Sequence, residues 1–351
     1  MRRAIWLLVF AAGSVPAILV EACSSDDTSA TTGPDGGADQ TVPDAGSDAA
    51  ALVARGDYLV NTLGSCGDCH TPRNADHTLG PALSGNDCFA GGPPDAGPGC
   101  LASRNLTNDV TGLKNLSDDD VKAAFQHGKG PTNTNLWSIM PYWVYANLTD
   151  EDANAVVAYL RTVPAVNHRV AGNTGMFNQN PPLIDPIDMS QIPTPTKDNN
   201  PDYDSEIRGR YIAAVSAACV ECHTAQDSQG HPIREKWFAG GRDFPAFTLG
   251  LTTPSYPTDI YSANLTQDPD HGLIGHSVDD IVRTIKRGLE KDGGGMCPPM
   301  PVGPGGSYGK MTDDDAKDVA RYLLTLPGKT SDDAGHNPIP NGCVAPPDAG
   351  N

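Results

Sequence analysis

Aromatic residues and basic residues are both scarce in this 351-residue chain. Phe, Trp and Tyr make up 6% of the residues, and 24 Lys and Arg stand against 43 Asp and Glu. The resulting net charge of −19 argues against a nucleic-acid partner, which needs clustered positive charge. Gly and Pro are abundant, with 38 and 31 residues, and the length allows two domains. Together these features favour small, loop-rich domains that wrap around a large apolar group.

Cysteine and histidine are also scarce, with nine residues each, yet together they form two matching pentapeptides. Both read Cys-x-x-Cys-His, the pattern for covalent attachment of a c-type haem, in which the two thiols form thioethers and the histidine faces the iron. A thioredoxin-like redox pair would not need histidine in both copies, and half a zinc site would leave the repeat described next unexplained. The sequence therefore predicts two haem c groups, held by Cys66, Cys69 and His70 and by Cys219, Cys222 and His223.

The similarity between the two motif regions extends well beyond the pentapeptides. Arg55-Gly-Asp-Tyr58 recurs 153 residues later as Arg208-Gly-Arg-Tyr211. Further matched pairs are Phe89-Ala90-Gly91-Gly92 with Phe238-Ala239-Gly240-Gly241, Asn105-Leu106-Thr107 with Asn264-Leu265-Thr266, Met140-Pro141 with Met300-Pro301, and Tyr159-Leu160 with Tyr322-Leu323. The offset drifts by ten residues, as loop insertions would produce. We interpret this pattern as an internal duplication of one domain.

Helix signals dominate both copies and predict a mainly α fold. A helix is expected from Ala54 into the first haem motif. Each Ser or Thr followed by a run of acids predicts an N-cap, with charges that favour the helix dipole. These positions are Ser117, Thr149, Ser277 and Thr312. The last helix of each copy is expected to stop at Val163-Pro164 or Leu326-Pro327, because proline ends a helix. The acids are thus interpreted as helix starts and not as metal ligands.

Met140 and Met300 are the predicted sixth ligands of the two irons. Each follows its haem histidine by 70 or more residues, precedes a proline and stands before the last helix of its copy. A thioether suits low-spin haem and fast electron transfer. Met296 and Cys297 are competing ligands for the second iron, Cys297 because some sulfur-oxidising cytochromes use a thiolate. Bis-histidine ligation would instead draw on His77, His127, His231 or His271, none of which has an equivalent in the other copy.

The N-terminus carries the features of an export signal. Two arginines, an apolar run and Ala22-Cys23 resemble a lipoprotein signal over residues 1–22, with Cys23 lipidated and anchored to a membrane. An ordinary secretory signal and an uncleaved anchor are the alternatives. Residues 23–51 are expected to form a disordered acidic tether, since residues 24–50 hold six Asp and no Lys or Arg. The chain is therefore expected on the periplasmic side or the cell surface of a Gram-negative bacterium.

Four cysteines lie outside the haem motifs and the lipid box. In an oxidising compartment this even number suggests two disulfides. Cys88 and Cys100 bracket a Gly/Pro-rich loop and form the natural pair, which leaves Cys297 with Cys343.

A short helix, Cys-x-x-Cys-His, a loop region, a methionine loop and a final helix together resemble a class I c-type cytochrome. Two such domains in tandem are similar to cytochrome subunits of periplasmic alcohol and gluconate dehydrogenases, which usually carry three. The resemblance implies a carbonyl at Pro81 that accepts a hydrogen bond from His70. It also implies propionate contacts by Asn105 and Asn264, for which a turn-forming role is the alternative. The expected domains are residues 52–164 and 205–328, joined by a Pro/Asn-rich linker at 165–204 and followed by a tail at 329–351.

Electron transfer without substrate chemistry is the function this pattern favours. The two haems would carry electrons from a dehydrogenase-like donor to a cytochrome or oxidase acceptor. A haem enzyme, either a di-haem peroxidase or a thiosulfate-oxidising cytochrome, is the alternative. A peroxidase needs an acid/base group beside an iron that opens, and no motif of the chain supplies one.

Overall fold

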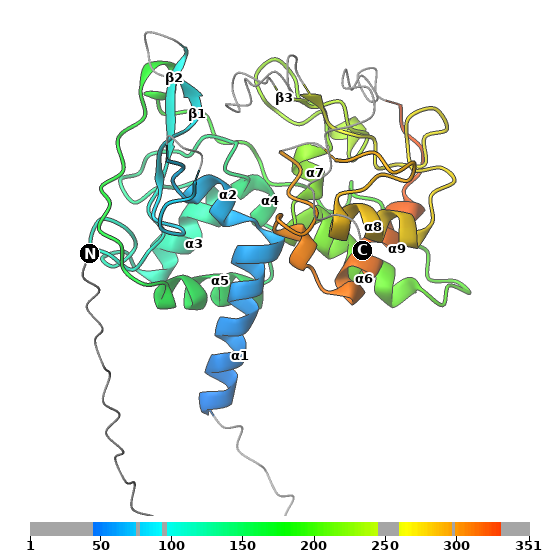
Figure 1. The fold of residues 1–351 in the computed structure, drawn as a ribbon, viewed down its shortest axis with the longest axis horizontal. Coiled ribbons are helices and arrows are strands. Elements are labelled where there is room, and N and C mark those ends of the chain that lie inside the picture. Colours follow the sequence, from blue (N-terminus) through cyan, green and yellow to red (C-terminus); the bar gives the residue numbers. More distant parts are fainter. Residues whose placement is uncertain (1–44, 75–77, 93–96, 245–259, 297–298, 331–351) are drawn as a thin grey trace, which may run out of the picture. The chain divides into compact units, whose positions relative to one another are not determined.

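The computed structural model describes residues 45–74, 78–92, 97–244, 260–296 and 299–330. The described residues lie in one compact unit that is rich in helices and loops and poor in strands (Figure 1). This agrees with the predicted mainly α, loop-rich fold. The predicted signal segment, Cys23 and the Cys297–Cys343 pair lie outside the described residues.

The same order of helices occurs before and after the middle of the unit. We call residues 45–163 the first half and residues 203–326 the second half. The first half contains α1 (Ala45–Tyr58), a π-helical turn (Leu59–Leu63), α2 (Cys66–His70), β1 (Asn86–Gly92), β2 (Gly99–Ser103), α3 (Asp118–His127), α4 (Tyr142–Tyr145) and α5 (Asp150–Thr162). The second half contains α6 (Tyr203–Tyr211), a π-helical turn (Ile212–Ser216), α7 (Cys219–Cys222), β3 (Asp243–Phe244), β4 (Ile260–Tyr261), α8 (Val278–Arg287) and α9 (Asp313–Thr325). Short 3-10 turns lie at Gly175–Phe177, Arg234–Lys236 and Tyr308–Lys310.

A glycine in each half lets the first and last helices cross at close range. A Cβ at Gly56 of α1 would lie 1.9 Å from the carbonyl oxygen of Ala155 in α5. A Cβ at Gly209 of α6 would lie 1.9 Å from the carbonyl oxygen of Asp318 in α9. Only glycine leaves room for backbone to approach backbone in this way. The repeated Arg-Gly-x-Tyr motif is therefore a helix-crossing motif.

The arginine of that motif pairs with an acid on the crossing helix. Arg55 donates from Nε to Asp152 Oδ1 at 2.8 Å and from a terminal nitrogen to Asp152 Oδ2 at 2.9 Å. Arg208 donates from Nε to Asp318 Oδ2 at 2.8 Å. Asp152 and Asp318 are buried, so each is compensated by a charge-assisted hydrogen bond. These bonds hold each crossing in place.

The tyrosine of the motif binds the start of a helix in the other half. Tyr58 donates to Asp315 Oδ2 at 2.7 Å and accepts from the Thr312 N–H at 3.0 Å. Tyr211 does the same in reverse, donating to Asp152 Oδ2 at 2.7 Å and accepting from the Thr149 N–H at 3.2 Å. Burial, together with the hydrogen bond to a carboxylate, raises the pKa of each tyrosine to about 12, so both hydroxyls keep the proton that they donate. The two halves are thus joined by a reciprocal pair of contacts.

The predicted helix starts and stops are confirmed. The four predicted caps, Ser117, Thr149, Ser277 and Thr312, each accept a hydrogen bond from the backbone N–H three residues later. The final helices end at Thr162 and Thr325, just before the two prolines. One boundary differs from the prediction, because α1 begins at Ala45, within the segment expected to be a tether. The run of alanines from Ala49 to Ala51 and the packing of α1 on α5 favour helix there.

The segment between the halves lies against both of them. His168 Nδ1 pairs with the Ser84 carbonyl at 2.8 Å, and the Ile187 N–H donates to the Trp143 carbonyl at 3.0 Å. Further along, Ile192 is fully buried, and the Pro193 carbonyl accepts from Tyr322 of α9 at 3.1 Å. The linker therefore adds to the packing of the unit.

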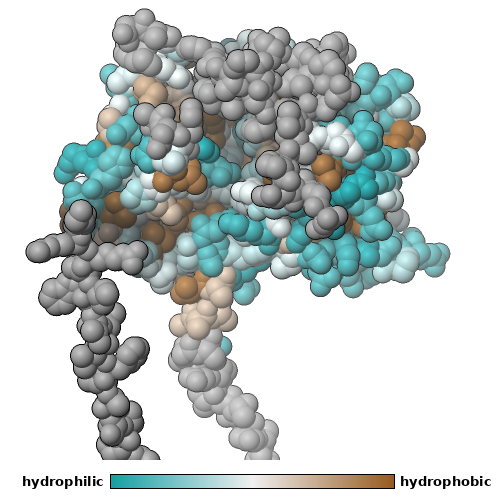
Figure 2. Space-filling view, in the orientation of Figure 1, coloured by the Kyte–Doolittle hydropathy of each residue, from teal (hydrophilic) through white to brown (hydrophobic). Residues whose placement is uncertain are grey.

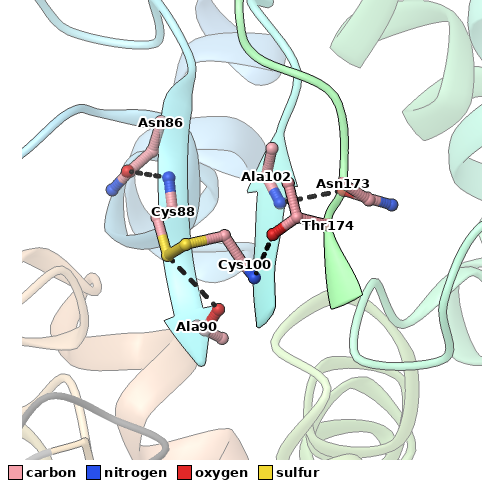
Figure 3. The surroundings of a disulfide bond; sticks show 7 residues. All are labelled: Asn86, Cys88, Ala90, Cys100, Ala102, Asn173 and Thr174. Atoms are coloured by element: carbon pink, nitrogen blue, oxygen red, sulfur yellow. Dashed lines mark hydrogen bonds between the residues drawn. A yellow bond between two sulfur atoms is a disulfide. The ribbon is translucent and has the colours of Figure 1, made fainter. Parts of the chain in front are cut away.

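The predicted disulfide between Cys88 and Cys100 is confirmed (Figure 3). It joins β1 to β2, which pair antiparallel with Asn86 opposite Ser103 and Gly92 opposite Gly99. Figure 3 shows the linker beside this hairpin, where Thr174 accepts from the Cys100 N–H at 2.8 Å and Asn173 from the Ala102 N–H at 3.0 Å.

Among the described residues, no helix is long and apolar enough to cross a membrane.

Gly209→Ala should destabilise the protein by about 1–3 kcal/mol, because the new methyl group must push α6 away from α9. Gly56→Ala should do the same at the other crossing. Gly172→Ala is the matched control, since nothing lies within 4 Å of a Cβ there. Urea unfolding measures the difference, and equal midpoints for Gly209→Ala and Gly172→Ala would contradict the crossing argument.

Removing the disulfide by Cys88→Ser with Cys100→Ser should lower the free energy of unfolding by about 3 kcal/mol, because the cross-link closes a short loop. Dithiothreitol should destabilise the parent protein by a similar amount and leave the double variant unchanged. A parent protein whose unfolding midpoint ignores dithiothreitol would argue against a stabilising cross-link.

Candidate haem sites

Both Cys-x-x-Cys-His motifs begin a short helix after a sharp change of chain direction. A π-helical turn ends the preceding helix, and Ser65 and Ala218 then adopt the left-handed region with φ of 48° and 50°. A left-handed conformation costs an L-residue roughly 1–2 kcal/mol, and such strain is concentrated at functional sites. In both halves, the chain changes direction at this left-handed residue, and the motif helix begins at the next residue, the first cysteine of the motif.

The four motif cysteines lie in pairs one helical turn apart, and none of them forms a disulfide. Burial raises the pKa of Cys66, Cys69 and Cys219 to about 12, and that of Cys222 well above its usual value. Such thiols stay protonated, unlike the thiolates of redox catalysts and zinc sites. Two spaced, protonated thiols beside a histidine fit thioether attachment of a porphyrin.

Each motif histidine is held in one orientation by a hydrogen bond to a backbone carbonyl. His70 donates from Nδ1 to the Arg104 carbonyl at 2.7 Å, and His223 donates from Nδ1 to the Ala263 carbonyl at 2.8 Å. Burial lowers the pKa of both imidazoles and keeps them neutral. With Nδ1 carrying the proton, Nε2 has a free lone pair for a metal, and the carbonyl raises its basicity. The residues present therefore fit haem.

The carbonyl bonded to His70 is not the one predicted. The Pro81 carbonyl accepts from the Ser84 hydroxyl at 2.8 Å, within its own turn, and His70 turns to Arg104. The same position of the second half supplies the partner of His223, since Arg104 precedes Asn105 and Ala263 precedes Asn264. The residue before Asn-Leu-Thr is thus the acceptor in both halves.

Asn105 and Asn264 fix the loops that carry these carbonyls. Each side-chain oxygen accepts from the backbone N–H and hydroxyl of the threonine two residues later, Thr107 or Thr266. Each amide nitrogen donates to the chain that leaves the last helix, at the Val166 carbonyl in the first half. The Lys329 carbonyl is the acceptor in the second. These buried contacts match the turn-forming alternative, and a propionate contact stays a prediction.

Met140 and Met300 occupy equivalent positions in the two halves. Both are partly buried and pack against the apolar core. The Met140 carbonyl accepts from the Tyr142 N–H at 2.7 Å, and the Met300 carbonyl accepts from the Val302 N–H at 3.0 Å. The structure thus gives both methionines the same backbone turn at the edge of the core. Their binding to iron stays a prediction.

Two buried tyrosines that the sequence reasoning missed lie beside the motifs. Tyr145 donates to the Gly64 carbonyl at 3.3 Å, and Tyr308 donates to the equivalent Ala217 carbonyl. Burial raises the pKa of Tyr145, with smaller contributions from Cys66 of the first motif and Glu221 of the second. The π-helical turns ahead of the two motifs also contact each other. The two candidate haem sites therefore adjoin.

The second site contains a buried ion pair at the motif. Glu221 and Arg242 are 7% and 9% exposed, and Arg242 donates to both the carboxylate and the backbone carbonyl of Glu221, the latter at 3.0 Å. The residue equivalent to Glu221 in the first motif, Asp68, is exposed. The buried indole N–H of Trp237 has no acceptor among the described residues, so a bound group could accept its hydrogen bond. The two sites therefore differ in charge and burial.

Comparison with known proteins agrees with this site. No family model matches the chain. It is 30% identical over 298 residues to the gluconate 2-dehydrogenase cytochrome c subunit of Pantoea cypripedii, covering 80% of this chain and 60% of that protein. It is 32% identical over 302 residues to the cytochrome c subunit of the quinone alcohol dehydrogenase of Gluconacetobacter polyoxogenes, covering 81% and 57%. A diheme c-type cytochrome of Cereibacter sphaeroides is 24% identical over 286 residues, covering 75% and 82%.

The fold and the motifs agree with these relatives in resembling c-type cytochromes, and this likeness implies covalently bound haem c. More particularly, the chain is similar to cytochrome c subunits of dehydrogenases, and it spans about 60% of the length of the first two. Both relatives are named as cytochrome c subunits, in agreement with the resemblance drawn from the sequence motifs.

Glu221→Gln should destabilise the protein by about 3–5 kcal/mol, because it leaves the Arg242 guanidinium buried without a counter-charge. Asp68→Asn, the same change at the exposed equivalent position, should shift the unfolding midpoint little. Chemical denaturation of the two variants tests this contrast. A Glu221→Gln variant as stable as Asp68→Asn would show that the ion pair does not stabilise the second motif.

Proposed function

We propose that this protein is a di-haem electron carrier. One haem c is held by Cys66, Cys69 and His70, with Met140 as the second ligand. The other is held by Cys219, Cys222 and His223, with Met300 as the second ligand. With both haems bound, the protein would carry electrons from a dehydrogenase-like donor to a cytochrome or oxidase acceptor.

The observation that carries the proposal is the repeated histidine geometry. In both halves Nδ1 of the motif histidine is bonded to a backbone carbonyl, which directs Nε2 to the iron-binding role beside the two cysteines that would form the thioethers. A second bond fixes each histidine backbone, from the Gly85 N–H to the His70 carbonyl at 2.7 Å and from the Gly240 N–H to the His223 carbonyl at 2.9 Å. Such bonds hold each imidazole rigid, so an iron bound to it would change its oxidation state with little reorganisation.

Haem c, when bound, supplies an iron that alternates between ferric and ferrous states. The protein's part is to hold it and to tune it. The carbonyls of Arg104 and Ala263 set the basicity of the two imidazoles. Methionine in the sixth position would close each iron to peroxide and raise its potential, which suits a carrier better than an enzyme.

Two class I domains related by duplication, at residues 52–164 and 205–328, account for the paired contacts. The glycine crossings at Gly56 and Gly209 recur, as do the hydroxyl bonds of Tyr145 and Tyr308 ahead of the motifs. Equivalent residues making equivalent bonds is what a duplicated domain predicts.

An exported location is part of the proposal. The Cys88–Cys100 disulfide is typical of an oxidising compartment. In the proposed arrangement the N-terminal segment exports the chain, and lipidated Cys23 anchors it to a membrane.

The near-infrared absorption of the oxidised protein tests the two methionine ligands. The wild type should show a methionine-to-iron charge-transfer band and no response to cyanide or peroxide. Met140→Ala and Met300→Ala should each remove about half of that band, because each would open one of two irons. Met176→Ala is the control, since Met176 is 51% exposed and has no equivalent in the second half.

A high-spin spectrum or ready peroxide binding in the wild type would contradict the closed sites. A band of undiminished strength in Met300→Ala would assign the second iron to another ligand, with Met296 and Cys297 as the candidates.

A further inference from the structure

A groove on the surface of the second half is lined mainly by basic side chains. It has a volume of about 420 Å³ and lies between α8 and α9. Its cations are Arg283, Lys286, Arg287 and Lys317, and its acids are Asp279 and Asp313. Figure 2 shows hydrophilic surface over this part of the chain. A basic groove is unexpected in a protein with a net charge of −19.

Two of the four cations make no hydrogen bond or ion pair to another described residue. Arg283 pairs with Asp280 at 3.2 Å, and Lys286 pairs with Asp313 at 3.0 Å. Arg287 and Lys317 make no hydrogen bond or ion pair to another described residue, although Lys317 helps to lower the pKa of Asp313. The lining of the groove therefore carries an excess of positive charge, with four cations against two carboxylates.

The first half has the same helices without these charges. α3 and α5 of the first half correspond to α8 and α9, and both α3 and α8 begin with a serine capping box. The residues equivalent to the four cations are Ala123, Gln126, His127 and Asn154. None of the four carries a permanent positive charge. The basic groove is thus a property of one half and not of the shared scaffold.

The groove backs onto the loop that carries Met300. The Gly303 N–H donates to the Ile285 carbonyl of α8 at 3.1 Å, and the Met296 N–H donates to the Gly288 carbonyl at 2.8 Å. The Lys286 ammonium donates to the Met311 carbonyl at the end of the same loop region. A molecule in the groove would therefore rest on the helix that supports the proposed second haem ligand.

We propose that this groove docks an acidic redox protein, which exchanges electrons with the haem of the second half. The inference rests on the proposed electron-carrier function and names the chemistry of one partner. An acidic partner is attracted to the groove and repelled by the acidic remainder of the chain. Attraction at the groove and repulsion from the rest of the surface steer the partner protein to the groove and fix the orientation in which it binds. The lack of equivalent cations in the first half directs the partner to one of the two haems.

Binding and electron transfer with a small acidic blue-copper protein test the proposal, using the full haem-loaded chain. Arg287→Glu with Lys317→Glu should weaken binding and slow electron transfer about tenfold or more at low ionic strength. The matched control is His127→Glu with Asn154→Glu, which places the same charges at the equivalent positions of the first half and should change little. High salt should remove most of the difference between the variants, because exposed charges are screened.

Equal losses in the two variant pairs would overturn the proposal, since they would reflect net charge alone. Anionic phosphatidylglycerol vesicles form a second arm, and a groove that binds vesicles but not the acidic protein would be a membrane contact instead. Titration calorimetry measures binding independently of electron transfer, so the groove proposal and the electron-carrier proposal can fail separately. Wild-type binding without electron transfer would contradict the carrier, and electron transfer that is insensitive to Arg287 and Lys317 would contradict the groove.

Discussion

The close crossing of the first and last helices is the constraint on which the rest of the structure depends. Gly56 and Gly209 let α1 and α6 approach the backbones of α5 and α9, where any side chain would collide. This approach lets Arg55 reach Asp152 and Arg208 reach Asp318. It also places Tyr58 and Tyr211, the tyrosines of the same motif, where each binds the start of a helix in the other half. Because the π-helical turns and haem motifs follow directly, the crossing sets where both motifs begin.

The two candidate sites share one way of preparing a histidine. The chain reverses through a left-handed residue, and the motif helix then starts. The carbonyl of the residue before Asn-Leu-Thr accepts a hydrogen bond from Nδ1 of the histidine. Asn105 and Asn264 hold that loop through buried hydrogen bonds, so the acceptor carbonyl has a fixed position. Tyr145 and Tyr308 brace the turn ahead of each motif. The local strain is thereby balanced by contacts that come from distant parts of the chain.

Differences between the halves give the two sites separate properties. The first half has a disulfide-linked hairpin that contacts the linker, whereas the second has the buried Glu221–Arg242 pair and the Trp237 indole. Charge near a haem and the burial of its surroundings both alter its potential. The basic groove of the second half adds a difference at the surface. A shared scaffold with such differences suits a carrier that receives electrons at one end and delivers them at the other.

The sequence by itself determined the elements that depend on neighbouring residues. Cys-x-x-Cys-His, the serine and threonine caps, the proline stops and the Cys88–Cys100 pair all act over short stretches, so their spacing alone predicts them. The helical residues from Ala45 were missed because composition favours a tether, whereas packing on α5 favours a helix. The partner of His70 was misassigned because a carbonyl acceptor can be any residue, and only the fold brings Arg104, 34 positions away, to the imidazole. The tertiary structure likewise decided the tyrosine contacts between the halves, the Glu221–Arg242 pair and the basic groove. Each of these joins residues that are distant in the chain, and no local pattern records which distant groups will meet.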